Sequence, residues 1–190
     1  CMYKLAYNSP CLEPEVFGQA EQLPDFYYDQ ICRASVELEK KAPSGLFSDI
    51  AAVSITCIRD TVLILDKDHR PLRNIIVWMD SRRAKGSPKM PFWQKCLFRI
   101  VGMTQTVDML YKDTFFNWIV ENEPELWEKT DKFVLLPGYI SYRLTGVLKD
   151  SVANQVGHIP FDNRNRRWMK RGLSRCVADI PPEKLIDLVE

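Results

Sequence analysis

The sequence lacks the features that mark several common classes of protein. None of its six cysteines belongs to a Cys-x-x-Cys pair, and only two histidines could join them, so free buried thiols are expected in place of a zinc site or a disulfide framework. No stretch approaches the roughly 20 apolar residues of a membrane helix, and the opening residues do not have the layout of a signal peptide. We therefore expect a cytoplasmic protein with no membrane partner and no bound metal.

An excess of charge of either sign is also missing. The chain has 26 Lys and Arg against 25 Asp and Glu, a formal net charge of +1, which argues against a surface that seeks polyanions. A nucleic-acid partner is therefore not expected. Internal repeats, low-complexity tracts and linker-like segments are absent, and 190 residues suit one ordinary domain with its own core.

The sequence does contain alternating helical and strand patterns. From Asp25, an expected N-cap, apolar residues recur at helical spacing as far as residue 38. Residues 50–57 are small or β-branched without alternation, which predicts a central strand covered on both faces. Residues 61–65 and 74–78 predict two further strands joined by a polar turn, and together these segments predict a mixed sheet.

Beyond Asp80 the chain is expected to be mainly helical. Residues 133–136 interrupt the helices as a short buried strand, and further helices are predicted around Trp168 and from Pro181 onward. A helix after Pro137 is expected to close at a glycine. The residues that mark these helices are Phe115, Trp118, Ile119, Leu126, Trp127 and the closing Gly146.

Several collinear pieces of the sequence resemble the FGGY family of carbohydrate kinases. In that family a strand ends in a polar pair, a hairpin follows, and a second strand ends in Trp, Asp and Arg, which is the pattern of residues 54–61 followed by residues 65–82. Single pieces are weak signals, but pieces in this order and at these spacings are specific and cover most of the chain. The later pieces are Asn-Trp-Ile-Val-Glu-Asn-Glu-Pro-Glu at 117–125, Tyr-Ile-Ser-Tyr-Arg-Leu-Thr-Gly at 139–146 and Asp-Ser-Val-Ala-Asn at 150–154.

The resemblance implies a fold of two ribonuclease H-like domains of the actin-like ATPase kind, with sugar and ATP meeting between them. Residues 1–190 are then expected to be a partial N-terminal, sugar-binding domain, an α/β unit with a mixed sheet flanked by helices and incomplete at both ends. The family's phosphate-binding first hairpin would precede this chain. Its catalytic Asp base is expected beyond Glu190, followed by the C-terminal ATP-binding domain. ATP and Mg²⁺ would bind mainly to those parts, and the chain alone is expected to be inactive.

Arg59, Asp60 and Trp78 are the main candidates for substrate binding. A sugar pocket needs donors, acceptors and an apolar plate for the C–H faces, and these three side chains supply all of them. Glycerol kinases of the family carry Arg-Glu where Arg59 and Asp60 stand and bind substrate hydroxyls with it. The alternatives are a surface ion pair at a turn and, for Trp78, packing in the core.

Asp80 and Tyr111 are candidates of a second rank. Asp80 is expected chiefly to cap and brace a following helix together with Arg82. Leu110 stands where glycerol kinases have a substrate-binding Tyr, with Tyr111 one place later, which makes Tyr111 a candidate and glycerol a less favoured substrate. His158 has no carboxylate placed to orient it, so we do not expect it to act as an acid or base.

The function implied by the resemblance is ATP-dependent phosphorylation of a sugar or polyol hydroxyl, with a pentulose or related ketose favoured. The alternative is a non-catalytic sugar-binding or regulatory relative of the same fold. A ribonuclease H-like nuclease is disfavoured because residues 50–57 hold no carboxylates that could bind metal ions. The expected partners are a small-molecule sugar or polyol and, because the family often forms dimers, a second copy of the protein.

Overall fold

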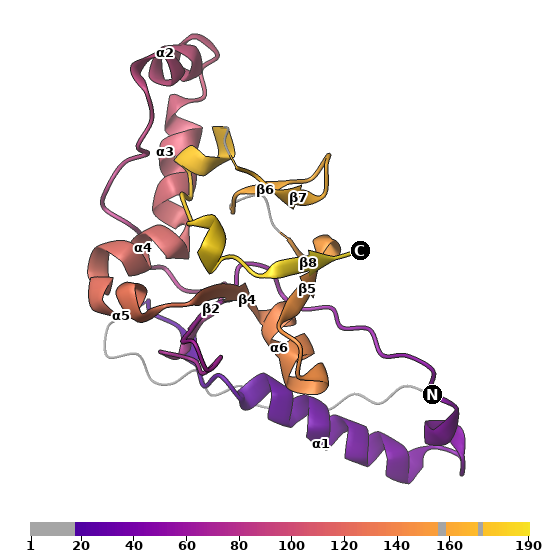
Figure 1. Cartoon of the computed structure of the whole chain (residues 1–190). Coiled ribbons are helices and arrows are strands. Elements are labelled where there is room, and N and C mark those ends of the chain that lie inside the picture. Colours follow the sequence, from indigo (N-terminus) through magenta and orange to yellow (C-terminus); the bar gives the residue numbers. More distant parts are fainter. Residues whose placement is uncertain (1–17, 156–158, 171–172) are drawn as a thin grey trace.

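The computed structural model describes residues 18–155, 159–170 and 173–190. Its centre is a four-stranded sheet with the order β1-β3-β2-β4, in which each pair of neighbours is antiparallel (Figure 1). Two smaller units follow, a parallel pair of β5 with β8 and an antiparallel pair of β6 with β7. The strands are β1 (Glu21–Gln22), β2 (Val62–Leu65), β3 (Ile75–Ile76), β4 (Lys132–Leu135), β5 (Lys149–Ser151), β6 (Phe161–Asp162), β7 (Arg167–Trp168) and β8 (Asp187–Val189).

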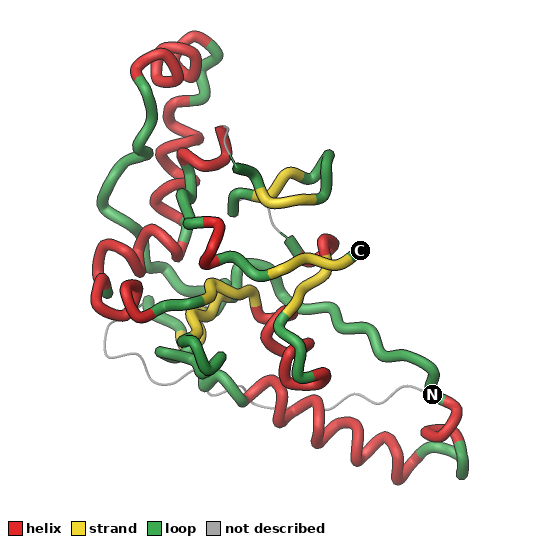
Figure 2. The backbone as a smooth tube through the Cα atoms, in the orientation of Figure 1, coloured by secondary structure: helices red, strands yellow, loops and turns green. Residues whose placement is uncertain are grey.

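Helices lie on both sides of this sheet and extend beyond it. Figure 2 shows one long helix, α1, at one end of the molecule and the pair α2 and α3 at the opposite end. The α-helices are α1 (Phe26–Lys41), α2 (Phe92–Ile100), α3 (Thr104–Asp113), α4 (Phe115–Asn122), α5 (Pro124–Lys129) and α6 (Leu136–Thr145). Short 3₁₀ turns are η1 (Leu46–Asp49), η2 (Val152–Asn154), η3 (Leu173–Cys176) and η4 (Pro182–Lys184).

The core follows from the two-residue period of β2. Every residue of this strand is buried, and alternate side chains enter two different clusters because successive side chains of a strand point to opposite faces. Val62 and Ile64 pack with α4, whereas Leu63 and Leu65 pack with α6 and the apolar side of α1. The sheet is therefore covered on both faces, and every residue of β2 and β3 is buried.

Several predictions from the sequence are confirmed. The helix that begins after Asp25 is α1, residues 61–65 and 74–78 contain the antiparallel pair β2 and β3, and residues 133–136 contain most of β4. Gly146 ends α6 in the left-handed region, at φ 76°, which glycine adopts without steric cost. Parallel pairing enters through β5 and β8, so the domain as a whole combines both kinds of pairing with flanking helices.

The prediction that residues 50–57 form a central covered strand is wrong for this structure. The segment runs extended from η1 toward β2 but has no strand assignment, and Val53 is 76% exposed (Figure 1). A strand needs a neighbour whose backbone groups complete its hydrogen bonds, and the described residues place none beside it. The composition of this segment predicted its extended backbone correctly but did not show whether another strand would pair with it.

Two predicted helices are also wrong. Trp168 lies in β7, because the Asp162 carboxylate accepts hydrogen bonds from the backbone N–H groups of Arg164 and Asn165 and so closes a tight turn between β6 and β7. The helix expected from Pro181 is the single turn η4, which leads into β8. Asp25 precedes α1, but its carboxylate does not cap the helix and instead accepts from the Tyr139 hydroxyl at 3.0 Å.

The cysteines that the structure describes form no disulfide bonds. Cys176 is buried, and Cys32, Cys57 and Cys96 are half-buried. The remaining two cysteines and His158 lie outside the described residues. Within the residues that the structure describes, every helix falls short of the length and apolar character that a bilayer-spanning segment requires.

Candidate functional site

The candidate site lies at the open end of the β2 and β3 hairpin, away from the turn that joins the two strands. Val62 pairs with Ile76 in antiparallel register. Asp60 precedes β2 and Trp78 follows β3, each in a turn beyond the paired residues. Two of the residues predicted to bind substrate therefore lie at the same end of the hairpin.

The backbone changes direction at Asp60. Its φ is 57°, in the left-handed region that Asp tolerates better than most residues, and residues 59 and 60 form a turn before β2 begins. Two neighbouring side chains can serve one ligand only where a strand has ended, and this turn meets that condition. The Arg59 side chain is exposed to solvent beside it.

Asp60 lines a small cavity on the α4 side of the sheet. Asp113 and Thr114, from the junction of α3 and α4, line the same cavity, whose volume is about 20 Å³. The sequence carried no signal for Asp113 or Thr114, because their proximity to Asp60 arises only from folding. A volume near that of one water molecule is far below the roughly 300 Å³ of a small-molecule site, so this cavity alone is too small for a sugar.

Trp78 is held on the outside of the hairpin. Its side chain is 54% exposed, and the neighbouring Met79 is 57% exposed. Core packing, the alternative interpretation of Trp78, is therefore wrong. An indole in this position presents an apolar plate to solvent, as the carbohydrate hypothesis requires.

Asp80 points inward at the turn that follows Trp78. Its side chain is 0% exposed and accepts hydrogen bonds from the backbone N–H of Ala20 at 2.6 Å and from Arg82 through both the backbone and the guanidinium. Burial opposes ionisation, but these donors prevail and hold the pKa of Asp80 below its usual value. No helix follows directly, since α2 begins at Phe92, so the predicted capping role is wrong and Asp80 braces a loop.

Arg82 extends this bracing into a buried ionic cluster, which we define as Glu21, Arg73, Asp80, Arg82 and Glu123. Arg82 donates to Glu21 at 2.8 Å, Arg73 pairs with both Glu21 and Glu123, and the Trp118 ring lies 4.7 Å from the Arg82 guanidinium carbon. The cluster ties β1 and the segment after β3 to the helical layer. It fixes the backbone on which Trp78 stands.

Tyr111 lies in a different cavity from Asp60. Its hydroxyl donates to Glu121 at 3.3 Å, and burial, with the charge of Glu121, raises the Tyr111 pKa. The cavity beside it has a volume of about 210 Å³ and shares only the Phe116 wall with the cavity of Asp60. The structure does not bring Tyr111 together with the other predicted residues.

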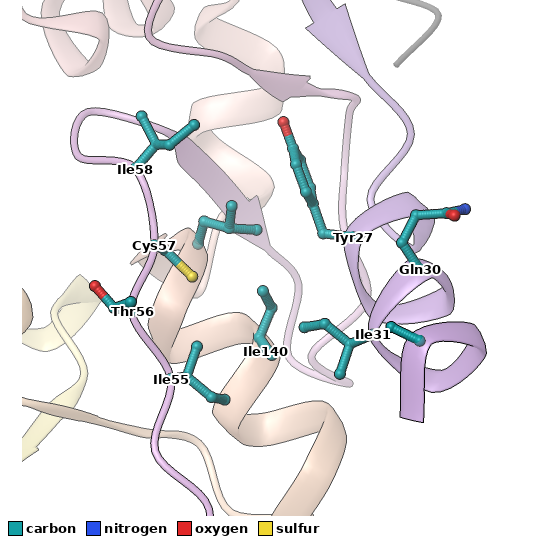
Figure 3. Close-up of a pocket in the computed structure, with 10 residues that line it drawn as sticks. Tyr27, Gln30, Ile31, Ile55, Thr56, Cys57, Ile58 and Ile140 are labelled. Atoms are coloured by element: carbon teal, nitrogen blue, oxygen red, sulfur yellow. The ribbon is translucent and has the colours of Figure 1, made fainter. Parts of the chain in front are cut away.

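A larger groove, which sequence reasoning did not anticipate, runs beside residues 55–58. Figure 3 shows Ile55 and Cys57 of this segment facing Tyr27 and Ile31 of α1, with Ile140 of α6 between them. Its volume is about 340 Å³ and its lining is mainly apolar. Burial, with the charge of Asp150, raises the pKa of Cys57 to about 11, so this thiol stays protonated at neutral pH.

The catalytic base is expected to follow Glu190, and Glu190 itself is not a candidate for that role. This carboxylate follows β8, is exposed, and lies 3.8 Å from the Arg166 guanidinium across the surface. It lines neither the cavity of Asp60 nor the groove beside residues 55–58. The position of the base therefore stays a prediction, outside residues 1–190.

Metal binding finds no support among the residues described. No group of three or more His, Cys, Asp or Glu side chains in the described ranges is arranged to hold a metal ion.

Comparisons with known proteins identify the family of the chain. Residues 5–190 match the model of the N-terminal domain of the FGGY family of carbohydrate kinases. The chain is 28% identical over 156 residues to a xylulose kinase of Bacillus subtilis, covering 81% of this chain and 30% of the relative. It is 30% identical over 181 residues to a glycerol kinase of Alteromonas mediterranea, covering 91% of this chain and 36% of the relative.

Solved structures share the fold. A gluconate kinase from Lactobacillus acidophilus superposes with a TM-score of 0.70 at 19% identity, covering 97% of this chain and 36% of the solved one. A ligand-bound xylulose kinase from the same organism superposes equally well, with the same score, identity and coverage. The chain spans about a third of the length of the relatives it matches. With the family match extending over nearly its whole length, the chain belongs to the FGGY family of carbohydrate kinases, within the N-terminal domain.

Proposed function

We propose that the whole protein transfers phosphate from ATP to a hydroxyl of a sugar or polyol, and that this chain supplies part of the sugar-binding wall. Asp60, before β2, and the exposed Trp78, after β3, lie at the same end of one hairpin, and Arg59 shares the turn of Asp60. That arrangement is the observation that carries the proposal. Family membership supports the reaction type.

Each of the three side chains has a separate role in this proposal. The Arg59 guanidinium donates to sugar oxygens, the Asp60 carboxylate accepts from sugar hydroxyls, and the Trp78 indole covers an apolar face of the ring or chain. Asp80 acts as a positioning residue, because its oxygens are already engaged inside the buried ionic cluster. Phosphoryl transfer asks mainly for such positioning of the acceptor hydroxyl.

In the proposal, ATP and Mg²⁺ bind to parts of the protein beyond these residues. The described residues offer no cluster of metal ligands, so we assign none of them to the metal. The base that removes the proton from the hydroxyl is likewise assigned to a part of the protein that follows Glu190.

A pentulose or a related ketose is the favoured substrate. Asp60 is one methylene shorter than the Glu that glycerol kinases carry at this position, which leaves more space for a substrate longer than three carbons. Tyr111, the candidate counterpart of their substrate-binding Tyr, lies in another cavity. Relatives named xylulose kinase point the same way.

A panel of substrates tests the proposal. The whole protein, supplied with ATP and Mg²⁺, is assayed for ADP release with D-xylulose, D-ribulose, gluconate and glycerol, and residues 1–190 alone serve as the inactive control. We expect kcat/KM for a pentulose to exceed that for glycerol at least about tenfold, since a site built around more hydroxyls loses hydrogen bonds with a shorter substrate. A preference for glycerol overturns the substrate assignment, and sugar binding without ADP release with any substrate favours the non-catalytic alternative.

We also propose that residues 50–57 pair, in the whole protein, with a strand that lies outside the described residues. The segment has a strand-like sequence, runs extended and borders the groove of Figure 3. Hydrogen exchange on the whole protein tests this. Slow exchange of the amides of residues 51–57 is expected, and exchange as fast as in the loop between α1 and η1 would contradict the pairing.

A further inference from the structure

Helix α2 exposes an apolar surface that the proposed function does not use. We define the apolar arc of α2 as Phe92, Trp93, Leu97, Ile100 and Val101, all of them exposed, with Phe92 and Ile100 each 82% exposed and Trp93 62% exposed. At 100° per residue these positions fill roughly half of the helix circumference. Phe98 lies outside the arc and is buried against Val107 of α3 and Cys176. The helix is therefore held from one side, and its arc faces solvent.

Cations outnumber acids beside this arc. Lys95 and Arg99 adjoin Phe92 on the helix surface, are exposed, and form no ion pair with a carboxylate in the described part of the chain. Asp108 lines the same cavity as these two cations and pairs with Lys112. Between Ser81 and Val107 the sequence contains six cations and no Asp or Glu, and two of the six, Arg82 and Arg83, are paired with carboxylates away from the arc.

The position of α2 leaves its arc accessible. Figures 1 and 2 show α2 at the tip of the molecule, beyond α3 and at the end opposite α1. Asp60, at the open end of the hairpin, lines a cavity with Asp113. Asp113 is the last residue of α3, at the opposite end of that helix from α2. A surface that contacts the arc would therefore leave the candidate sugar site uncovered.

We propose that α2 docks the protein reversibly onto an anionic lipid bilayer. A short amphipathic helix with aromatic and aliphatic residues on one face and Lys or Arg at its border lies in the interface of such a bilayer, where the cations meet lipid phosphates and the apolar side chains enter the acyl boundary. The protruding arc is convex and broad, which suits a fluid surface.

A second copy of the chain fits the arc less well. Two arcs in contact would bring Lys95 and Arg99 of both copies to the same interface, with no acid within residues 81–107 to neutralise them. The sequence predicted no membrane partner because it contains neither a membrane-spanning segment nor a signal peptide. That prediction did not consider a helix that binds to the membrane surface. The docking proposal does not depend on the kinase reaction.

Cosedimentation of the whole protein with vesicles tests the docking. One set of vesicles contains phosphatidylcholine alone, and the other contains phosphatidylcholine with phosphatidylglycerol. We expect at least about tenfold tighter binding to the anionic vesicles at low salt, and a loss of that difference at about 1 M salt, where the Debye length is about 3 Å. Equal binding to both sets, or binding to neither, overturns the proposal.

Variants locate the contact. Phe92→Ser with Trp93→Ser is expected to weaken binding to anionic vesicles at least about tenfold, and Lys95→Gln with Arg99→Gln about fivefold for each cation. Val36→Ser and Leu144→Ser remove exposed apolar side chains from α1 and α6 and should change nothing. Unchanged binding in the α2 variants overturns the assignment to this helix.

Two further measurements separate this inference from its rivals. If the whole protein is a dimer that the Phe92→Ser and Trp93→Ser variant dissociates, the arc joins two copies and the lipid proposal is overturned. ADP release by the same variant is expected to equal that of the wild type. If this variant loses vesicle binding but keeps ADP release, the result supports the docking surface. That conclusion does not depend on which substrate the protein phosphorylates.

Discussion

Two neighbouring regions of the molecule each contain an Asp, an Arg and a Trp. One of these trios is held inside the domain, and the other is open to solvent. What we call the buried trio consists of the buried Asp80 and Arg82 with the partly buried Trp118, and hydrogen bonds and a ring contact engage both of its charged groups. The open trio of Arg59, Asp60 and Trp78 lies at the end of the same hairpin with Arg59 and Trp78 exposed. One trio maintains the structure, and the other presents the same chemistry to a ligand.

The difference teaches that local backbone geometry decides the role of such residues. Asp80 follows a turn closed by its own N–H and the carbonyl of Val77, which directs its carboxylate toward β1. Asp60 sits at a left-handed position that precedes β2, which allows Arg59 to leave the line of the strand. The residue types are the same in both trios, so residue type alone does not separate their roles.

Removing a cation from the buried trio should produce the largest effect. Arg82→Leu leaves the Asp80 carboxylate buried without its main donor, so we expect the free energy of unfolding of the whole protein to fall by about 3–5 kcal/mol. Urea unfolding followed by tryptophan fluorescence measures this. Arg83→Leu is the matched control, because Arg83 is exposed and its ion pair with Asp113 is worth about 0–1 kcal/mol. Equal losses in both variants would contradict the distinction.

Neutralising the acid of the open trio should instead impair substrate use. Asp60→Asn keeps a side chain that tolerates the left-handed backbone but loses the charged acceptor, so kcat/KM for the sugar should fall about 10- to 100-fold, as expected for a hydrogen bond to a charged group. Stability should change by less than about 0.5 kcal/mol. Asp68→Asn, in the exposed turn of the hairpin, controls for the loss of one negative charge. An unchanged kcat/KM in Asp60→Asn would remove Asp60 from the site.

Much of the fold was predictable from the sequence because its strongest signals are local. The helical spacing before residue 38, the hairpin of β2 and β3 and the glycine that ends α6 each depend on a few neighbouring residues. Residues 50–57 show the limit, because a strand also needs a partner, and none lies beside them in the described part of the chain. Trp168 shows another, because an Asx turn at Asp162 overrode the expected helix.

The candidate site was predictable only in part. The hairpin places Asp60 and Trp78 at the same end of β2 and β3, and that follows from two strands and a turn. The neighbours Asp113 and Thr114, and the separate cavity of Tyr111, depend on how α3 and α4 pack on the sheet, which no local pattern encodes. The interior position of Asp80 depends on Ala20, a contact that spans sixty residues of sequence.

The smallest expected effect concerns pH, and it compares two buried acids. The pKa of Asp80 is held below its usual value because donors outweigh its burial, so its contribution to stability is present above the unfolded-state pKa and is lost as pH falls through the folded-state pKa. Burial raises the pKa of Asp150 despite hydrogen bonds from Asn154 and Gln155, so its contribution has the opposite sign and is lost as pH rises through the folded-state pKa.

Urea midpoints of the wild type, Asp80→Asn and Asp150→Asn, measured from about pH 3 to pH 7, test these signs. The stability deficit of Asp80→Asn should shrink as pH falls below the usual Asp pKa, because the wild type loses its ionised carboxylate there. Asp150→Asn should gain relative to the wild type as pH rises above that value, because the variant has no charge to bury. Parallel pH curves for the two variants would mean that the donors around Asp80 do not offset its burial, and the buried trio would then resemble Asp150 more than we infer.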